Sequence, residues 1–173
     1  MPSLVRHPNS PSDAVQSIEA ELERLPGGAI ATFKVRGDLT KLVIPPAASP
    51  QRSDELWRTT CFELFVAGEG SGYREYNFSP SGAWAAYEFA DYRDGMRNVQ
   101  AAIEMEISQA NNILELSAKI NTDFPNPVLV GLTSVIEEGE GRLGYWSTSF
   151  APGKPDFHAA AVRSLLFDGV SAE

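Results

Sequence analysis

Strict alternation of apolar and polar residues over short segments is the feature that most constrains how this chain can fold. In 99–107 the apolar residues occupy every second position, and glutamine or glutamate stands between most of them. Segment 114–120 repeats the pattern after the turn residues Asn111 and Asn112. A period of two places one set of side chains on a core and the other set in solvent. We therefore predict two half-buried strands joined as a hairpin.

Other segments, and the turns between them, extend this prediction to an all-β fold. Segments 29–36 and 60–66 also alternate, and 128–136 is an apolar run typical of a strand covered on both sides. Segment 15–25 fits a helical stripe as well as a strand, but the Pro26-Gly27-Gly28 that follows favours a strand in a hairpin. The pattern predicts one antiparallel β-sandwich, of jelly-roll or immunoglobulin-like type, with about nine or ten strands.

Length and charge narrow the class of protein further. The 173 residues fit a single domain, and we expect a sandwich over 15–168, a flexible N-terminal segment at 1–14 and a C-terminal tail at 169–173. The net charge of −9 argues against nucleic-acid partners, because phosphate binding needs a clustered basic surface. The same charge disfavours adhesion to an anionic membrane.

Cysteine content and apolar segments bear on the compartment. Cys61 is the only cysteine, so an internal disulfide and a structural zinc–thiolate cluster are excluded, and we expect a small packed side chain there. No stretch approaches the roughly 20 apolar residues needed to span a bilayer. The start of the chain lacks the apolar segment of a secretory signal. These features predict a cytoplasmic protein.

A carboxylate and an amide fall on neighbouring predicted strands. If the Phe62 and Phe78 side chains meet in the core, pleating brings Glu63 and Asn77 out together on the opposite surface. A carboxylate beside an amide can accept and donate hydrogen bonds to vicinal hydroxyl groups. The strands therefore predict a surface suited to a polar, ring-shaped ligand.

Two tryptophans could provide the walls of such a site. Trp57 stands just before the strand of Glu63, and Trp146 is a candidate for the opposing wall. Flat aromatic faces pack against the C–H faces of a sugar, and they also suit haem or other planar ligands. Either indole could instead fill the core or cover a sheet edge, and the residues alone leave both interpretations open.

Four sequence blocks resemble a bacterial group of DOMON-like domains, which is related to the family-9 carbohydrate-binding modules. The likeness runs from about residue 15 to about residue 168. The blocks are Leu56-Trp57-Arg58-Thr59-Thr60-Cys61-Phe62-Glu63, Tyr73-Arg74-Glu75-Tyr76-Asn77-Phe78-Ser79-Pro80-Ser81-Gly82, Tyr92-Arg93-Asp94-Gly95-Met96 and Lys154-Pro155-Asp156-Phe157-His158. The resemblance implies a sandwich that binds a sugar or a haem. Family-9 modules clamp a sugar between two tryptophans beside a carboxylate; Trp57 and Glu63 match in spacing, and Trp146 in approximate position.

The function predicted from these features is non-catalytic recognition of a small saccharide or similar polyol, without a metal or cofactor. The expected ligand-binding residues are Trp57, Glu63, Asn77, Arg93 and Trp146. A protein partner is an alternative, because exposed aromatic and arginine side chains, among them Arg58 and Arg74, are typical interface anchors.

Three further alternatives involve a cofactor, a metal or a reaction. The resemblance to DOMON proteins also implies a haem b electron-transfer domain, for which Met96 and His158 are the candidate axial ligands. Oxygen ligands around Asp54 and Asp91 could hold calcium, although their spacing matches no loop motif. A hydrolase pair of Glu63 with Asp156 or Glu88 can be imagined, but 23 acidic residues make accidental pairs plentiful.

Overall fold

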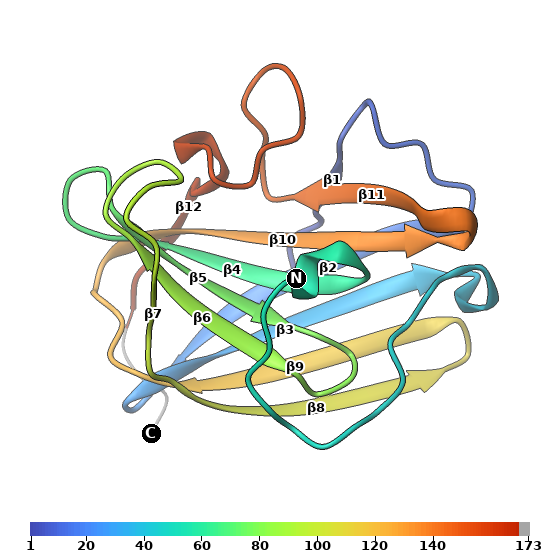
Figure 1. The fold of residues 1–173 in the computed structure, drawn as a ribbon, viewed down its shortest axis with the longest axis horizontal. Coiled ribbons are helices and arrows are strands. Elements are labelled where there is room, and N and C mark those ends of the chain that lie inside the picture. Colours follow the sequence, from blue (N-terminus) through green and yellow to red (C-terminus); the bar gives the residue numbers. More distant parts are fainter. Residues whose placement is uncertain (170–173) are drawn as a thin grey trace.

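Two antiparallel sheets stack face to face in the computed structural model, which describes residues 1–169, and form the predicted β-sandwich (Figure 1). One sheet has four strands in the order β2–β3–β9–β8. Its strands are β2 (Val15–Leu25), β3 (Gly28–Gly37), β8 (Ala102–Ala110) and β9 (Ile113–Asn121). The ambiguous segment 15–25 is therefore a strand, and the predicted hairpin forms between β8 and β9. Its turn uses the positive φ angles of Asn111 and Asn112, a backbone shape that asparagine tolerates well.

The second sheet has eight strands and carries the site described below. Its order is β1–β11–β10–β4–β5–β6–β7, with β12 pairing separately with β10. The strands are β1 (Val5–Arg6), β4 (Cys61–Ala67), β5 (Tyr73–Phe78), β6 (Trp84–Phe89), β7 (Arg97–Asn98), β10 (Val128–Glu138), β11 (Arg142–Ser147) and β12 (Leu165–Phe167). Over the described residues the strands thus number twelve, more than the predicted nine or ten, because β1, β7 and β12 are too short to show a period.

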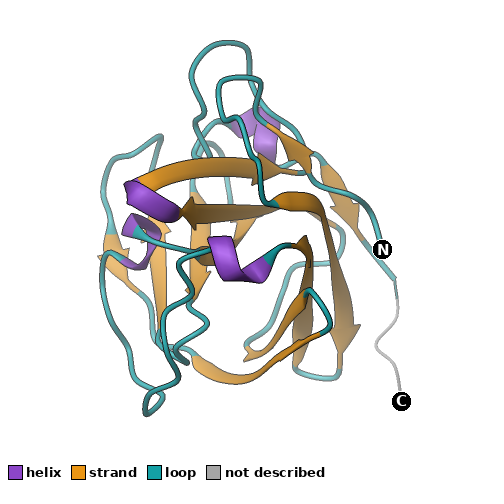
Figure 2. Cartoon of the chain, turned by 90° about the vertical axis from the view of Figure 1, so that its right-hand side faces the viewer, coloured by secondary structure: helices purple, strands orange, loops and turns teal. Residues whose placement is uncertain are grey.

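Helical structure in the described chain is limited to single 3-10 turns within the loops (Figure 2). These turns are η1 (Leu39–Lys41), η2 (Leu56–Arg58), η3 (Gly139–Gly141) and η4 (Ala160–Val162). Among residues 1–169, no helix has the length and apolar character that crossing a membrane requires.

The main core lies between the two sheets and follows the predicted alternation. Phe62 pairs with Phe78 across β4 and β5, and both rings contact Phe33 of the smaller sheet. Leu64 and Tyr76 form the next inward-facing pair. All five side chains are almost completely buried. Burial of aromatic and aliphatic area of this kind is the dominant stabilising contribution in a sandwich.

A second apolar cluster covers the outer face of the larger sheet. Its buried members are Cys61, Phe65, Tyr73, Ala85, Tyr87, Phe89, Val135 and Phe157. Both faces of β4 and β10 are therefore buried, which confirms the two-sided covering predicted for 128–136 and the packed role of Cys61. Loops, rather than a third sheet, close this outer face.

Gly131 allows the C-terminal segment to reach that outer face. A Cβ atom at Gly131 would lie only 2.5 Å from the Val162 carbonyl oxygen, closer than non-bonded atoms approach. Gly131 pairs with Phe65, whose side chain belongs to the outer cluster, so the close approach occurs on the outer side. Glycine at this position permits η4 to pack on β10, which holds residues 155–158 over the sheet.

The first fourteen residues lie against the sandwich instead of extending from it as a separate segment. β1 pairs with β11, Leu4 and Ala14 are buried, and the His7 ring is buried with its Nε2 atom 2.9 Å from the Gly153 carbonyl oxygen. These short contacts leave no periodic signal in the sequence. Of the predicted tail at 169–173, only Gly169 lies within the described residues.

Candidate ligand-binding site

A cavity of about 790 Å³ opens on the outer face of the larger sheet. This volume lies within the range of about 300–1,000 Å³ that small-molecule sites occupy. Strands β4, β5, β6, β10 and β11 supply its floor, and three loops supply its walls. The lining residues are Asp54, Glu55, Trp57, Glu63, Phe65, Glu75, Tyr87, Phe89, Arg93, Met96, Asn98, Val135, Tyr145, Pro155, Phe157 and His158.

Two buried glutamates form the polar centre of the floor. Glu63 pairs directly with Asn77 across β4 and β5, as the sequence predicts, and Glu75 is the next outward-facing residue of β5. Glu63 is 2% exposed and Glu75 is 5% exposed. With its amide nitrogen turned toward the acids, Asn77 donates to Glu63 Oε1 at 3.2 Å and to Glu75 Oε1 at 3.1 Å. Thr133 Oγ1 donates to Glu63 Oε2 at 2.9 Å.

Burial and proximity make the two glutamates share a proton near neutral pH. Burial raises the pKa of Glu63 well above its usual value, and the neighbouring Glu75 charge raises it further. Burial also raises the pKa of Glu75, to about 7, although hydrogen bonds from Asn77 and Glu63 oppose this shift. A protonated Glu63 that donates to an ionised Glu75 satisfies both carboxyl groups.

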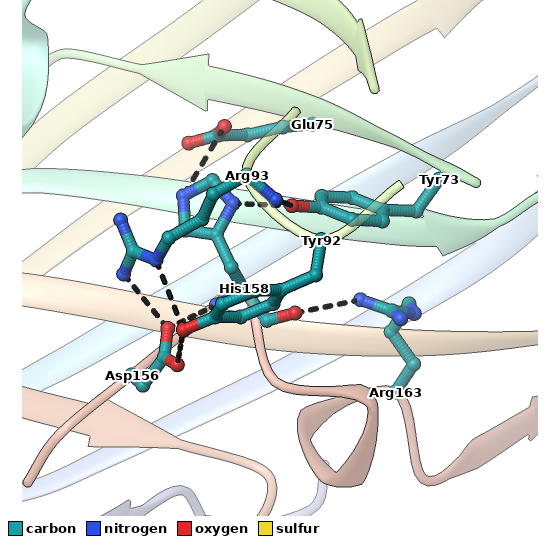
Figure 3. Close-up of polar contacts among 7 residues, drawn as sticks. All are labelled: Tyr73, Glu75, Tyr92, Arg93, Asp156, His158 and Arg163. Atoms are coloured by element: carbon teal, nitrogen blue, oxygen red, sulfur yellow. Dashed lines mark hydrogen bonds and ion pairs between the residues drawn. The ribbon is translucent and has the colours of Figure 1, made fainter. Parts of the chain in front are cut away.

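His158 lies beside Glu75 as a neutral ring (Figure 3). Burial and the nearby Arg93 charge lower the pKa of His158 to about 4. Its Nδ1 atom lies 2.7 Å from the Tyr73 hydroxyl oxygen, which accepts the Arg93 backbone N–H at 3.1 Å. We infer that Tyr73 donates its own proton to Nδ1. The ring proton then resides on Nε2, which faces Glu75 Oε2 at 3.8 Å.

The mouth of the cavity is held by an ion pair between Arg93 and Asp156 (Figure 3). Arg93 Nη2 donates to Asp156 Oδ1 at 2.8 Å, and the Tyr92 hydroxyl donates to the other carboxylate oxygen. Burial works to raise the pKa of Asp156, but these bonds and the backbone N–H of His158 lower it below its ordinary value. Arg93 therefore lines the cavity with its charge engaged by Asp156.

Aromatic side chains form the remaining walls. Trp57, on η2, is 47% exposed and lines the cavity. Tyr87 lines it from β6 and donates its hydroxyl proton to Asp54 Oδ1 at 2.6 Å. Phe157 and Tyr145 complete the aromatic lining on the side of the C-terminal loop and β11. Such rings can pack against the apolar face of a bound ring.

Trp146 does not form the opposing wall, and this part of the predicted site is wrong. Trp146 is 6% exposed and belongs to the core between the sheets. It pairs with Ser134, which pairs in turn with the inward-facing Phe62. Successive strand residues point to opposite faces, so its neighbour Tyr145 points outward and lines the cavity instead.

The other predicted residues divide between the cavity and its surroundings. Trp57, Glu63 and Arg93 line it, Asn77 lies fully buried beneath the floor, and both candidate haem ligands, Met96 and His158, also line it. Glu75 is a site residue that the sequence prediction omits. The alternation of β5 places Glu75 on the same face as Asn77, the partner of Glu63, and two residues before it. This spacing is the signal that could have revealed Glu75.

Two of the residues considered for a hydrolase or a protein interface form ion pairs. Glu88 forms ion pairs with Arg97 at 3.0 Å and with Arg74 at 3.9 Å. Arg58 pairs with Glu55 at 3.0 Å. Within the part of the chain that the structure describes, no three histidine, cysteine or acidic side chains are grouped to hold a metal ion.

Comparison with known proteins identifies a similar fold. The chain superposes on the crystal structure of a "putative carbohydrate-binding protein" from Bacteroides uniformis with a TM-score of 0.67. The alignment covers 92% of this chain and 82% of that protein, at 13% sequence identity. No family model matches the chain, and no curated protein does. The two proteins thus share the arrangement of their strands.

Proposed function

We propose that the chain is a non-catalytic binding domain whose outer-face cavity holds a small saccharide or similar polyol. The observation that carries this proposal is the combination, in one cavity, of a buried carboxyl pair on the floor and an exposed tryptophan on the wall. The resemblance to DOMON-like domains and family-9 carbohydrate-binding modules supports it. The fold shared with the Bacteroides uniformis protein, described as carbohydrate-binding, supports it as well.

The chemistry of the floor suits hydroxyl groups. A hydrogen bond to an ionised carboxylate contributes about 1.5–3 kcal/mol, roughly twice the contribution of a neutral bond. Glu63 and Glu75 offer such acceptors, and the aromatic rings of Trp57, Tyr145 and Phe157 offer apolar surfaces for the C–H faces of a sugar ring. The floor carboxyl groups would hydrogen-bond the ligand, and the aromatic side chains would pack against its sides.

The same geometry argues for binding over hydrolysis. Glycosidases keep their two carboxyl groups at least about 5 Å apart, so that the scissile bond fits between them. Glu63 and Glu75 are hydrogen-bonded to each other on one side of the cavity, which leaves no room for a bond between them. The pair therefore serves better as a single, proton-sharing acceptor.

Tryptophan fluorescence provides the test of the proposal. Titration with a panel of monosaccharides and disaccharides should change the emission of the wild-type chain, and Trp57→Ala should abolish binding while the fold is retained. Leu166→Ala, which truncates a 61% exposed side chain on β12, is the matched control and should bind like the wild type. Unchanged emission across the whole panel would refute the proposal, as would full binding by Trp57→Ala.

Haem is the second candidate, because Met96 and His158 line the same cavity. The residues present do not fit it. His158 Nδ1 is bonded to Tyr73, its Nε2 faces Glu75, and the two floor acids would repel the haem propionates. The cavity's one lining arginine, Arg93, is already paired with Asp156. Addition of hemin should therefore produce no sharpened Soret band.

A further inference from the structure

The cavity carries an excess of negative charge. Its lining includes four acids (Asp54, Glu55, Glu63 and Glu75) and one basic side chain, Arg93. Three of these charges have partners outside the lining: Arg52 pairs with Asp54 at 3.2 Å, Arg58 pairs with Glu55 at 3.0 Å, and Asp156 balances Arg93. The negative charge of the proton-sharing glutamate pair remains uncompensated. A neutral sugar would enter this cavity without relieving the imbalance.

The floor acids lack the cationic partner that buried acids normally have. Among the described residues, no lysine or arginine nitrogen lies within 4.0 Å of Glu63 or Glu75; the one ionisable nitrogen that close is Nε2 of the neutral His158. Buried carboxylates in proteins are as a rule paired with a cation or fully hydrogen-bonded. These two are held by neutral donors and by each other, without a cation, and both line the cavity.

Glu138 shows how the same chain treats a buried acid that serves only the fold. It is 4% exposed, yet Arg142 Nη2 donates to it at 2.7 Å, and Ser12 and the backbone N–H of Ala14 donate as well. Burial works to raise the pKa of Glu138, but these bonds lower it below its ordinary value. Glu63 and Glu75 have no equivalent of Arg142.

The aromatic walls supply the second half of a cation site. Aromatic faces carry negative charge density and attract ammonium groups, most strongly when water is excluded. Six aromatic side chains line the cavity around the acids: Trp57, Phe65, Tyr87, Phe89, Tyr145 and Phe157. Rings and buried carboxylates together recognise an organic cation better than either does alone.

We propose that the cavity selects a ligand that carries an ammonium group, placed against Glu63 and Glu75 and surrounded by the aromatic walls. This inference rests on the proposed function and deepens it: among saccharides, an amino sugar with a free amine is the preferred class. The amine would lie against the Glu75 carboxyl group, which lines the cavity beside His158 (Figure 3).

Below pH 7 Glu75 also holds a proton, which such a cation must displace, so its affinity rises with pH through about 7. Other titratable or charged groups lie around the pair. They are Cys61 on β4, Tyr73 on β5, Tyr87 on β6, Arg93 at the mouth, and His158 and Arg163 on the C-terminal segment. None of these has its midpoint shifted to near neutrality, so the glutamate pair dominates between pH 6 and pH 8.

Calorimetry with matched sugars tests the inference. At pH 7 the full chain is titrated with glucose, glucosamine and N-acetylglucosamine, with the galactose and mannose series, and with choline, whose charge does not change with pH. We expect an amino sugar to bind at least ten-fold more tightly than its neutral and acetylated counterparts. We also expect choline to bind more tightly at pH 8 than at pH 6, with net proton release.

The outcomes separate the two proposals. If neutral sugars bind as tightly as amino sugars, the ammonium inference is overturned and the saccharide proposal stands. If choline binds and no sugar does, the saccharide proposal is overturned and the inference stands. If nothing binds, both are overturned.

Glu75→Gln supplies a matched variant, because it keeps the size of the side chain and removes its charge. It should lower the ratio of amino-sugar affinity to neutral-sugar affinity at least ten-fold, because an ammonium group depends on the carboxylate charge more than a hydroxyl group does. Glu104→Gln, the same change at an exposed position on β8, should preserve the preference. A thermal melt confirms the fold of each variant. An unchanged preference in Glu75→Gln would overturn the inference.

Discussion

The two faces of the β4–β5 pair share one backbone and have opposite uses. Inward, Phe62, Leu64 and Tyr76 fill the space between the sheets and leave nothing open. Outward, Glu63 and Glu75 lie on a surface that loops cover only in part, so a cavity remains. A sheet facing another sheet must be apolar throughout, whereas a sheet facing loops can keep polar groups and empty space. Because a slip of one residue would exchange the faces, the register that builds the core also builds the site.

Trp146 and Trp57 show the same contrast between the core and the cavity. Substitution of Trp146 should cause the largest loss of stability among the changes considered. Trp146→Ala should lower the free energy of unfolding by about 3–5 kcal/mol, because it empties a packed core position. Trp57→Ala removes a side chain that is 47% exposed and should cost below about 1 kcal/mol. Urea unfolding monitored by circular dichroism measures both. Equal losses of unfolding free energy in the two variants would contradict the assignment of Trp146 to the core and of Trp57 to the cavity wall.

The acids of the outer face should make stability depend on pH. The pKa of Glu75 is raised on folding from 4.5 to about 7, so its protonated form favours the native state. This contribution is complete below pH 4.5 and is lost as pH rises through 7. Relative to Glu75→Gln, the wild type should therefore lose about 2 kcal/mol between pH 4.5 and pH 7.5.

Paired unfolding curves at several pH values provide this measurement, and the difference between the two chains cancels most other titrating groups. A wild type that gains stability over Glu75→Gln as pH rises would contradict the raised pKa of the pair.

His158 should make the free energy of unfolding depend on pH in the opposite direction. Its pKa falls on folding from 6.5 to about 4, so the stability of its neutral form is present above pH 6.5 and is lost as pH falls toward 4. His158→Asn should therefore flatten the acid side of the stability profile by about 1–2 kcal/mol. NMR titration of the His158 ring checks the direction; a midpoint at or above 6.5 would show that the ring is not buried as described.

Removal of the ion pair at the mouth of the cavity should cause the smallest loss of stability. Arg93 is about half exposed, so solvent screens most of its attraction to Asp156. Asp156→Asn should cost about 0.5–1 kcal/mol of unfolding free energy. A thermal melt detects this, and Asp123→Asn, at an acid outside every described ion pair, is the control. A cost several times larger would mean that the mouth is part of the folding core.

Local patterns in the sequence predict those features of the fold that depend on one strand or on two strands consecutive in the chain. Alternation reveals the hairpin of β8 and β9, and pleating within β4 and β5 is enough to place Glu63 beside Asn77. These features depend on side-chain period and on turns of a few residues, which a short window contains. The sandwich fold and half of the site follow from them.

Long-range register accounts for what the sequence does not reveal. The face of Trp146 depends on how β11 pairs with β10, and β1, with two residues, forms only because β11 offers an open edge. Likewise, the proximity of His158 to Glu75 depends on a C-terminal loop that returns over Gly131. No local period encodes such contacts.

The central claim is that ligand enters the outer face and leaves the inner face untouched. The three indole N–H resonances test this directly, because the chain has three tryptophans and they lie in different environments. With saturating glucosamine, we predict that the Trp57 resonance shifts while those of Trp84 and Trp146 stay in place. A shift at Trp146 with none at Trp57 would contradict the account.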